Sequence, residues 1–99
     1  MINILLVEDH VLTRMGLSML LNGADGINLL AEAGDGIDGI KKARELSPDV
    51  ILMDIGLPNI DGIEATQRIK DFNPDIKILI FTSRDSETDV FEAFKAGAD

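Results

Sequence analysis

The chain has 99 residues, of which 45% are hydrophobic and none is cysteine. This length and composition fit one domain with its own core, and they exclude a disulfide framework, a thiolate metal site and a disordered chain. The 18 acidic and 9 basic residues give a net charge of -9, which excludes counterion-driven binding to a nucleic-acid backbone. We expect a soluble, cytoplasmic protein, because no apolar run reaches the roughly 20 residues of a membrane span and no signal segment opens the chain.

Short aliphatic runs alternate with stretches in which apolar residues recur at helical spacing. The pattern predicts, in chain order, a strand at 2–7, a helix at 12–22, a strand at 27–33, a helix at 37–46, a strand at 49–54, a helix at 63–72, a strand at 76–82 and a helix at 85–96. Such strict alternation is typical of a doubly wound α/β fold, in which right-handed crossovers join parallel strands.

Chemically capable side chains follow three of the four predicted strands. Glu8 and Asp9 end the first strand, Asp54 ends the strongly hydrophobic third strand, and Thr82 ends the fourth. Because the carboxyl ends of parallel strands meet at one edge of a sheet, we expect the three carboxylates to share a small volume. Taken singly, each acid has an ordinary alternative as a helix cap or a solvated loop residue.

Crowded carboxylates repel one another, so at least one pKa should rise unless a cation neutralises them. Mg²⁺ is the natural cation, because it binds oxygen ligands, needs few carboxylates and keeps several waters. A carboxylate beside Mg²⁺ is suited to phosphoryl transfer, in which an oxygen of Asp54 would attack in line while the metal neutralises charge. The hydroxyl of Thr82 would donate a hydrogen bond to a phosphoryl oxygen.

Four spaced motifs, VEDH at 7–10, LMDIGLPNIDG at 52–62, FTS at 81–83 and KAGAD at 95–99, resemble the receiver domain of bacterial two-component response regulators. The segments at 14–17 and 61–66 resemble the subfamily whose receivers precede a helix-turn-helix DNA-binding domain. The resemblance covers residues 1–99. It implies a flavodoxin-like sheet with strand order 2-1-3-4, and a signalling domain that catalyses only its own phosphoryl transfer.

The resemblance also implies roles for particular residues. Asp54 matches the phosphoacceptor, which receives its phosphoryl group from a sensor histidine kinase, and Thr82 matches the switch hydroxyl. Asp9 matches the direct Mg²⁺ ligand and Glu8 a ligand that acts largely through water. Gly56 matches the residue whose backbone carbonyl completes the metal shell.

The sequence departs from the resembled family by ending after four of five strand–helix pairs. We therefore expect an incomplete receiver over 1–99 that lacks the fifth-strand lysine and is phosphorylated slowly or incompletely. We also expect an unpaired edge at the fourth strand and a bared apolar surface near the first helix. Both favour self-association as a dimer. The alternative function is therefore a phosphorylation-independent interaction module.

Two rival interpretations are weaker. Residues 34–39 spell G-x-G-x-x-G after a strand and before a helix, as in dinucleotide-binding proteins. Its two acidic residues, Asp35 and Asp38, would repel a pyrophosphate. The second rival is a hydrolase built on Asp54. The single histidine, His10, has no serine or cysteine nucleophile at a recognisable spacing. We expect His10 to help start the first helix instead.

Overall fold

The computed structural model describes residues 1–81, 97 and 99. The described elements are β1 (Ile2–Val7), α1 (Val11–Asn22), β2 (Ile27–Ala33), α2 (Gly36–Leu46), β3 (Val50–Asp54), α3 (Gly62–Phe72) and β4 (Lys77–Phe81). They follow the predicted order, and each predicted boundary within this part of the chain lies within about a residue of the observed one. The helix predicted at 85–96 lies outside the described residues.

The four strands form one parallel sheet with the order β2-β1-β3-β4. The flavodoxin-like order 2-1-3-4 is therefore confirmed. In the sheet, Val7 pairs with Met53 and Asp54 pairs with Phe81, so the carboxyl ends of β1, β3 and β4 lie level with one another. This register brings the residues that follow these strands to one edge of the sheet.

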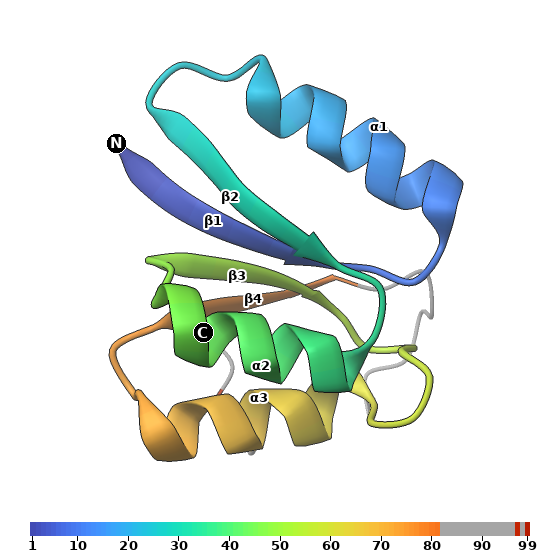
Figure 1. The fold of residues 1–99 in the computed structure, drawn as a ribbon, viewed down its shortest axis with the longest axis vertical. Helices are drawn as coiled ribbons and strands as arrows, with labels where there is room; N and C mark the ends of the chain where they lie inside the picture. Colours follow the sequence, from blue (N-terminus) through green and yellow to red (C-terminus); the bar gives the residue numbers. More distant parts are fainter. Residues whose placement is uncertain (82–96, 98) are drawn as a thin grey trace.

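The helices lie on both faces of the sheet, with α2 and α3 on one face and α1 on the other (Figure 1). The main core fills the space between the sheet and the α2–α3 layer. Its buried members are Leu5, Val7, Ala33, Ala43, Ile51, Met53, Leu57, Ala65, Ile69, Ile76 and Ile78. Alternate residues of β1 and β3 belong to it, because successive side chains of a strand point to opposite faces. The core thus anchors β1 and β3, the two strands that end in acidic residues.

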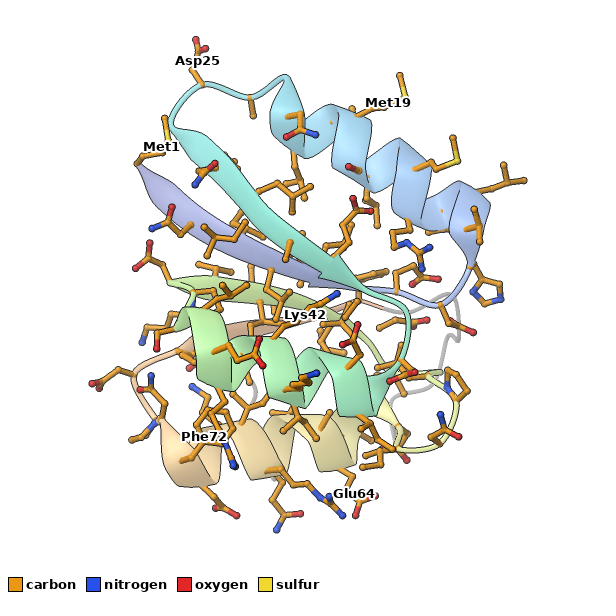
Figure 2. All side chains as sticks on the ribbon, in the orientation of Figure 1. Met1, Met19, Asp25, Lys42, Glu64 and Phe72 are labelled. Atoms are coloured by element: carbon orange, nitrogen blue, oxygen red, sulfur yellow. The ribbon has the colours of Figure 1, made fainter. Side chains whose placement is uncertain are left out.

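Helix α1 differs from the other two described helices because it has no buried residue. Its exposed apolar side chains include Leu12, which is 83% exposed, and Met19, which is 74% exposed. Met19 points away from the sheet in Figure 2. The expected apolar surface at this helix is therefore present.

In the segment 34–39, Gly36 and Gly39 allow close packing and Asp35 caps a helix. A Cβ on Gly36 would overlap the carbonyl oxygen of Ile60, and one on Gly39 would lie 3.0 Å from a methyl of Val7. The carboxylate of Asp35 caps α2 by accepting a hydrogen bond from the amide of Asp38 at 2.7 Å. The G-x-G-x-x-G spacing is therefore explained without a nucleotide.

Among the described strands β4 is the edge of the sheet, as expected, but Ile78 on this edge is hydrogen-bonded. The amide of Asp99 donates to the carbonyl of Ile78 at 2.8 Å, and the amide of Ile78 donates to the Asp99 carboxylate at 2.9 Å. Lys70 from α3 donates to the same carboxylate at 2.7 Å. Asp99 thus replaces a neighbouring strand at this residue.

None of the helices described is long and apolar enough to cross a membrane.

Candidate functional site

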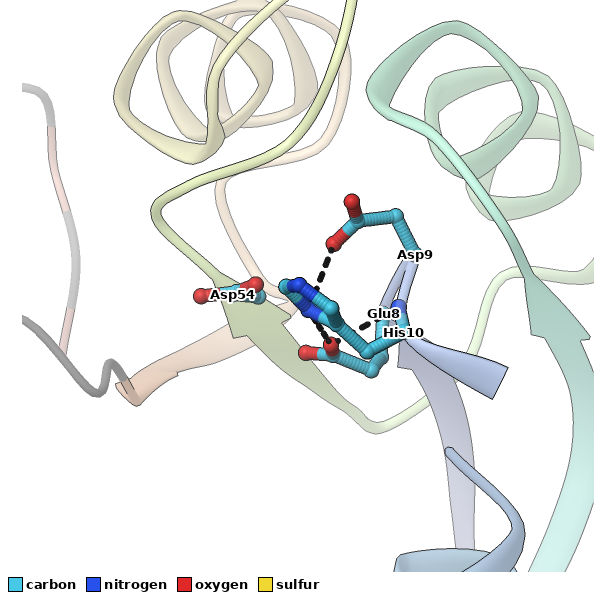
Figure 3. Close-up of side chains that lie close together, drawn as sticks. All are labelled: Glu8, Asp9, His10 and Asp54. Carbon is cyan, nitrogen blue, oxygen red and sulfur yellow. Dashed lines mark hydrogen bonds and ion pairs between the residues drawn. The ribbon is translucent and has the colours of Figure 1, made fainter. Parts of the chain in front are cut away.

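The carboxyl ends of β1 and β3 bring three carboxylates together, as the sequence predicts. Glu8, Asp9, Asp54 and also His10 each contribute one donor atom to a group whose members all lie within 4.8 Å of one another. Figure 3 shows the four side chains gathered at the strand ends. Here Glu8, Asp9 and Asp54 are called the acidic cluster.

Two members of the acidic cluster are nearly removed from solvent. Glu8 is 2% exposed and Asp54 is 7% exposed, whereas charged residues are seldom buried unless they are paired. Helix α1 covers the chain at Glu8, where Arg14 donates a hydrogen bond to the backbone carbonyl at 2.9 Å. The fold therefore places negative charge where water can screen it only weakly.

Asp54 combines burial with a single described hydrogen bond. Its Oδ1 accepts from the amide of Gly56 at 3.2 Å, and no described residue donates to Oδ2. Burial raises the pKa of Asp54, the Gly56 amide opposes this rise, and the carboxylates of Glu8 and Asp9 add to it. The carboxylate is thus held at Oδ1 by the Gly56 amide and lies beside the carboxylate of Glu8.

The loop from β3 to α3, residues 55–61, is called the site loop here, and its backbone is internally bonded. The amides of Leu57 and Gly62 both donate to the carbonyl of Ile55 at 2.9 Å, and the amide of Ile60 donates to that of Pro58 at 2.9 Å. Asp61 caps α3 by accepting from the amide of Glu64. Gly56 therefore lies in a loop that directly follows Asp54 and whose backbone is held by its own hydrogen bonds.

The environment of Asp9 also fits a bound divalent cation. Oδ1 of Asp9 is buried and makes no hydrogen bond of good geometry with a described residue, and Nδ1 of His10 lies 3.3 Å from it. A buried, unpartnered carboxylate oxygen is costly, and a bound cation removes that cost. The three carboxylates, with one described histidine beside them, also provide the oxygen ligands that a hard cation requires.

The sequence predicts a role for His10 at the start of the first helix but not its contacts with the acidic cluster. It stands at the N-cap of α1, as expected, but its side chain makes no capping hydrogen bond. Instead Nδ1 lies 2.9 Å from Oε1 of Glu8 and 3.3 Å from Oδ1 of Asp9. The hydrogen bond with Glu8 and the charge of Asp9 raise the pKa of His10. Its position directly after Glu8-Asp9 is the signal that could have revealed this role.

Two further residues, Gly56 and Thr82, are predicted for the site. Gly56 lies beside Asp54 through the hydrogen bond above, and the role of its carbonyl stays a prediction. Thr82 follows Phe81, the strand partner of Asp54, but lies outside the described residues.

Residues 4–99 match the response regulator receiver domain family. The chain belongs to this family. Among curated relatives, it is 45% identical over 98 residues to the transcriptional regulatory protein LiaR of Bacillus subtilis (strain 168), covering 99% of this chain and 46% of that protein. It is 41% identical to the response regulator GacA of Pseudomonas viridiflava, with the same two coverages. The chain therefore spans about half the length of these relatives.

Solved structures agree with this assignment. A two-component response regulator of the LuxR family from Aurantimonas sp. SI85-9A1 superposes with a TM-score of 0.93 at 38% identity, covering 98% of this receiver and 69% of that chain. The CheX–CheY–BeF3–Mg²⁺ complex from Borrelia burgdorferi gives a TM-score of 0.92 at 26% identity, covering 99% and 74%. This receiver is thus related to regulators of the LuxR family.

Proposed function

We propose that Asp54 is the phosphoacceptor of this receiver and that a sensor histidine kinase supplies the phosphoryl group. The observation that carries the proposal is the position of Asp54, which is nearly buried at the end of β3 inside the acidic cluster. Its Oδ1 is fixed by the Gly56 amide, whereas Oδ2 has no donor among the described residues. An oxygen held at this point can act as a nucleophile of fixed position.

The reaction balances as a simple transfer. An oxygen of Asp54 forms a bond to phosphorus while the bond from phosphorus to the kinase's phosphohistidine nitrogen breaks. The electron pair of that bond returns to the imidazole, which takes up a proton. The products are an aspartyl phosphate and free histidine. As an autophosphorylating signalling domain, the receiver needs no separate substrate site.

We further propose that Mg²⁺ is the resident cation. The residues that would hold it are Glu8, Asp9, Asp54 and the backbone carbonyl of Gly56. When bound, it supplies charge neutralisation for the phosphoryl oxygens. The support is the gathering of three carboxylates at the strand ends, with Oδ1 of Asp9 buried, and the name of the Borrelia burgdorferi structure, which includes both Mg²⁺ and BeF3. Thr82 stays the proposed donor to the phosphoryl group.

The decisive experiment treats the protein with acetyl phosphate and Mg²⁺ and measures the intact mass. We expect one added phosphoryl group that disappears in Asp54→Asn. The exposed Asp75→Asn variant is the matched control and should be labelled like the wild type. Equal labelling of Asp54→Asn and wild type would show that the phosphoacceptor is another residue.

For the longer protein, we propose phosphorylation-controlled regulation of transcription through a helix-turn-helix domain. The support is the similarity to a protein named as a transcriptional regulatory protein and to LuxR-family regulators. The test is whether phosphorylation of that longer protein changes its affinity for promoter DNA.

The exposed apolar face of α1 favours a second candidate, a module that pairs with another copy of itself independently of phosphorylation. Leu12 and Met19 stand out from a helix with no buried residue. Burying each such side chain stabilises a complex by about 1.5–3 kcal/mol. Association that is unaltered in Asp54→Asn would support this candidate.

A further inference from the structure

Arg14 is a charged residue on the face of α1 that lies against the sheet. The partly buried residues of this helix recur at the spacing of one helix face and are Arg14, Leu17, Ser18 and Leu21. Such a face is usually apolar, so a charged side chain on it calls for a physical reason. The Arg14 side chain is 25% exposed, and a Cβ on Gly34 would lie 3.3 Å from its Nη1. Gly34 therefore leaves room for a guanidinium group at this place.

The guanidinium of Arg14 connects the end of β1 to β2. Its Nη1 donates a hydrogen bond to the backbone carbonyl of Glu8 at 2.9 Å. Its Nε lies 3.6 Å from Oε1 of Glu32, and the hydroxyl of Ser18 donates to the other oxygen of that carboxylate at 3.4 Å. Glu32 pairs with Leu6 in the sheet, two residues before Glu8. The strand next to β1 thus holds the group that binds the Glu8 carbonyl.

This carbonyl belongs to the peptide group that joins Glu8 to Asp9, two of the proposed cation ligands. The amide of Glu8 donates to the carbonyl of Ala33 at 3.0 Å, so the peptide groups on both sides of Glu8 have partners. Because a peptide group is planar, holding its oxygen also places the α-carbon of Asp9 relative to that of Glu8. The directions of both carboxylates therefore depend on a contact that neither carboxylate makes.

We infer that Arg14 is a positioning residue of the acidic cluster, which raises the affinity for the cation by holding the Glu8–Asp9 peptide group. The inference rests on the proposed cation site and adds a residue from outside it. The charge of Arg14 alone would have the opposite effect, because a guanidinium near the site repels a cation. The sign of the change in affinity therefore distinguishes positioning from charge.

Isothermal titration of the tag-free chain with Mg²⁺ would compare wild type with Arg14→Met, Arg14→Lys and Arg68→Met. Arg68→Met is the matched control, because Arg68 is an exposed residue of α3 whose described ion pair is with Glu64. It removes the same charge without touching the Glu8–Asp9 peptide group. Circular dichroism establishes that each variant is folded, and urea unfolding measures its stability.

We expect Arg14→Met to weaken Mg²⁺ binding about tenfold, the low end of the 10–100-fold cost of losing a group that orients metal ligands, because Arg14 contacts their backbone. Arg14→Lys keeps the charge and a donor but not the fork that reaches Glu32, so its affinity should be intermediate. Arg68→Met should bind as wild type does.

Unchanged or tighter Mg²⁺ binding by folded Arg14→Met would overturn the inference. This holds also if the variant loses stability in urea, because Arg14 would then be a purely structural residue. If Arg14→Met does not fold, Arg14→Lys carries the test, and an affinity equal to or above that of wild type would overturn the inference.

A second measurement needs no metal. The ¹⁵N resonance of the Asp9 amide reports on the Glu8 carbonyl, because both belong to one peptide group. It should move in Arg14→Met and stay in place in Arg68→Met, and equal positions in wild type and Arg14→Met would overturn the inference. The cation site itself is tested by Asp9→Asn. If this variant loses Mg²⁺ binding and Arg14→Met does not, only the inference fails, whereas unchanged affinity in both would overturn the cation site as well.

Discussion

Gly62 packs directly against the backbone carbonyl of Asp54. A Cβ at residue 62 would overlap that carbonyl oxygen and would lie 2.9 Å from the α-carbon of Ile55. The amide of Gly62 also donates to the carbonyl of Ile55 at 2.9 Å. The start of α3 is therefore packed against the end of β3. The contact is made by the backbone of Asp54, the proposed phosphoacceptor.

Gly62→Ala should destabilise the protein by about 1–3 kcal/mol, the usual cost of overpacking, because the atoms that it meets belong to the backbone and cannot rotate away. The matched control is Gly16→Ala in the exposed middle of α1, where no atom lies within 4 Å of the added Cβ. That substitution should stabilise by about 0.5–1 kcal/mol. Urea unfolding measures both, and equal effects of the two substitutions would contradict the close contact.

Asp54→Asn should stabilise the metal-free protein at pH 7 by about 0.5–2 kcal/mol, the usual size of a stabilising substitution. The pKa of Asp54 is raised by burial and by its acidic neighbours above the ordinary value of 3.8. Its ionised form therefore costs stability, and this cost appears as the pH rises from 3.8 through the folded-state pKa. Asparagine removes the charge and keeps an acceptor for the Gly56 amide.

The gain from Asp54→Asn should accordingly vanish below pH 3.8, where both forms of residue 54 are neutral. Urea unfolding in EDTA at pH 7 and pH 3.5 checks this, with the exposed Asp75→Asn as control. A loss of stability at pH 7 would mean that the carboxylate makes favourable contacts beyond those described.

The ion pair between Lys70 and Asp99 should be visible in the titration of Asp99. The hydrogen bond from Lys70 lowers the pKa of Asp99 below its ordinary 3.8, with help from the Ile78 amide. The ion pair therefore stabilises the folded protein above pH 3.8, and this contribution is lost as the pH falls through the pKa of Asp99 in the folded protein. Lys70→Met should move the carboxyl titration upward, as measured by ¹³C NMR. It should cost less than about 1 kcal/mol, because the pair is partly exposed.

Lys41→Met on α2 is the control for that titration, because Lys41 is exposed and makes no described contact with Asp99. If both variants shifted the titration equally, general charge and not the specific ion pair would be the cause.

Concentration-dependent association should depend on α1. Leu12→Ser combined with Met19→Ser removes two exposed apolar side chains, so this variant should remain monomeric where the wild-type chain associates. Ile37→Ser is the matched control, because Ile37 is an exposed apolar residue on α2. Sedimentation velocity over a dilution series distinguishes the variants. A monomeric wild type at all concentrations would contradict the expectation.

Local sequence determines most of this fold. The bounds of β1 and β2 could be predicted from aliphatic runs, and the gathering of Glu8, Asp9 and Asp54 follows from parallel strand ends. These features depend on residues close together in the chain or on a general rule of sheet topology. No knowledge of individual side-chain contacts is needed for them.

Features that depend on contacts between distant segments could not be predicted in the same way. The spacing of Gly34, Gly36 and Gly39 resembles a nucleotide motif until the carbonyl of Ile60 is seen against Gly36. The position of the His10 ring depends on how the chain turns into α1. Asp99 pairs with Ile78 across 21 residues, which no local pattern encodes.

The hydrogen bonds inside the site loop have a consequence for the thermodynamics of binding. Because the amides of Leu57, Ile60 and Gly62 are already bonded within the loop or to its first residue, they should exchange with deuterium more slowly than a loop without helix or strand normally does. Ordering one backbone residue costs about 1–2 kcal/mol of conformational entropy. A segment that is already ordered does not lose this entropy when a ligand binds. A cation or phosphoryl group beside Gly56 would therefore bind with little loss of conformational entropy from the chain.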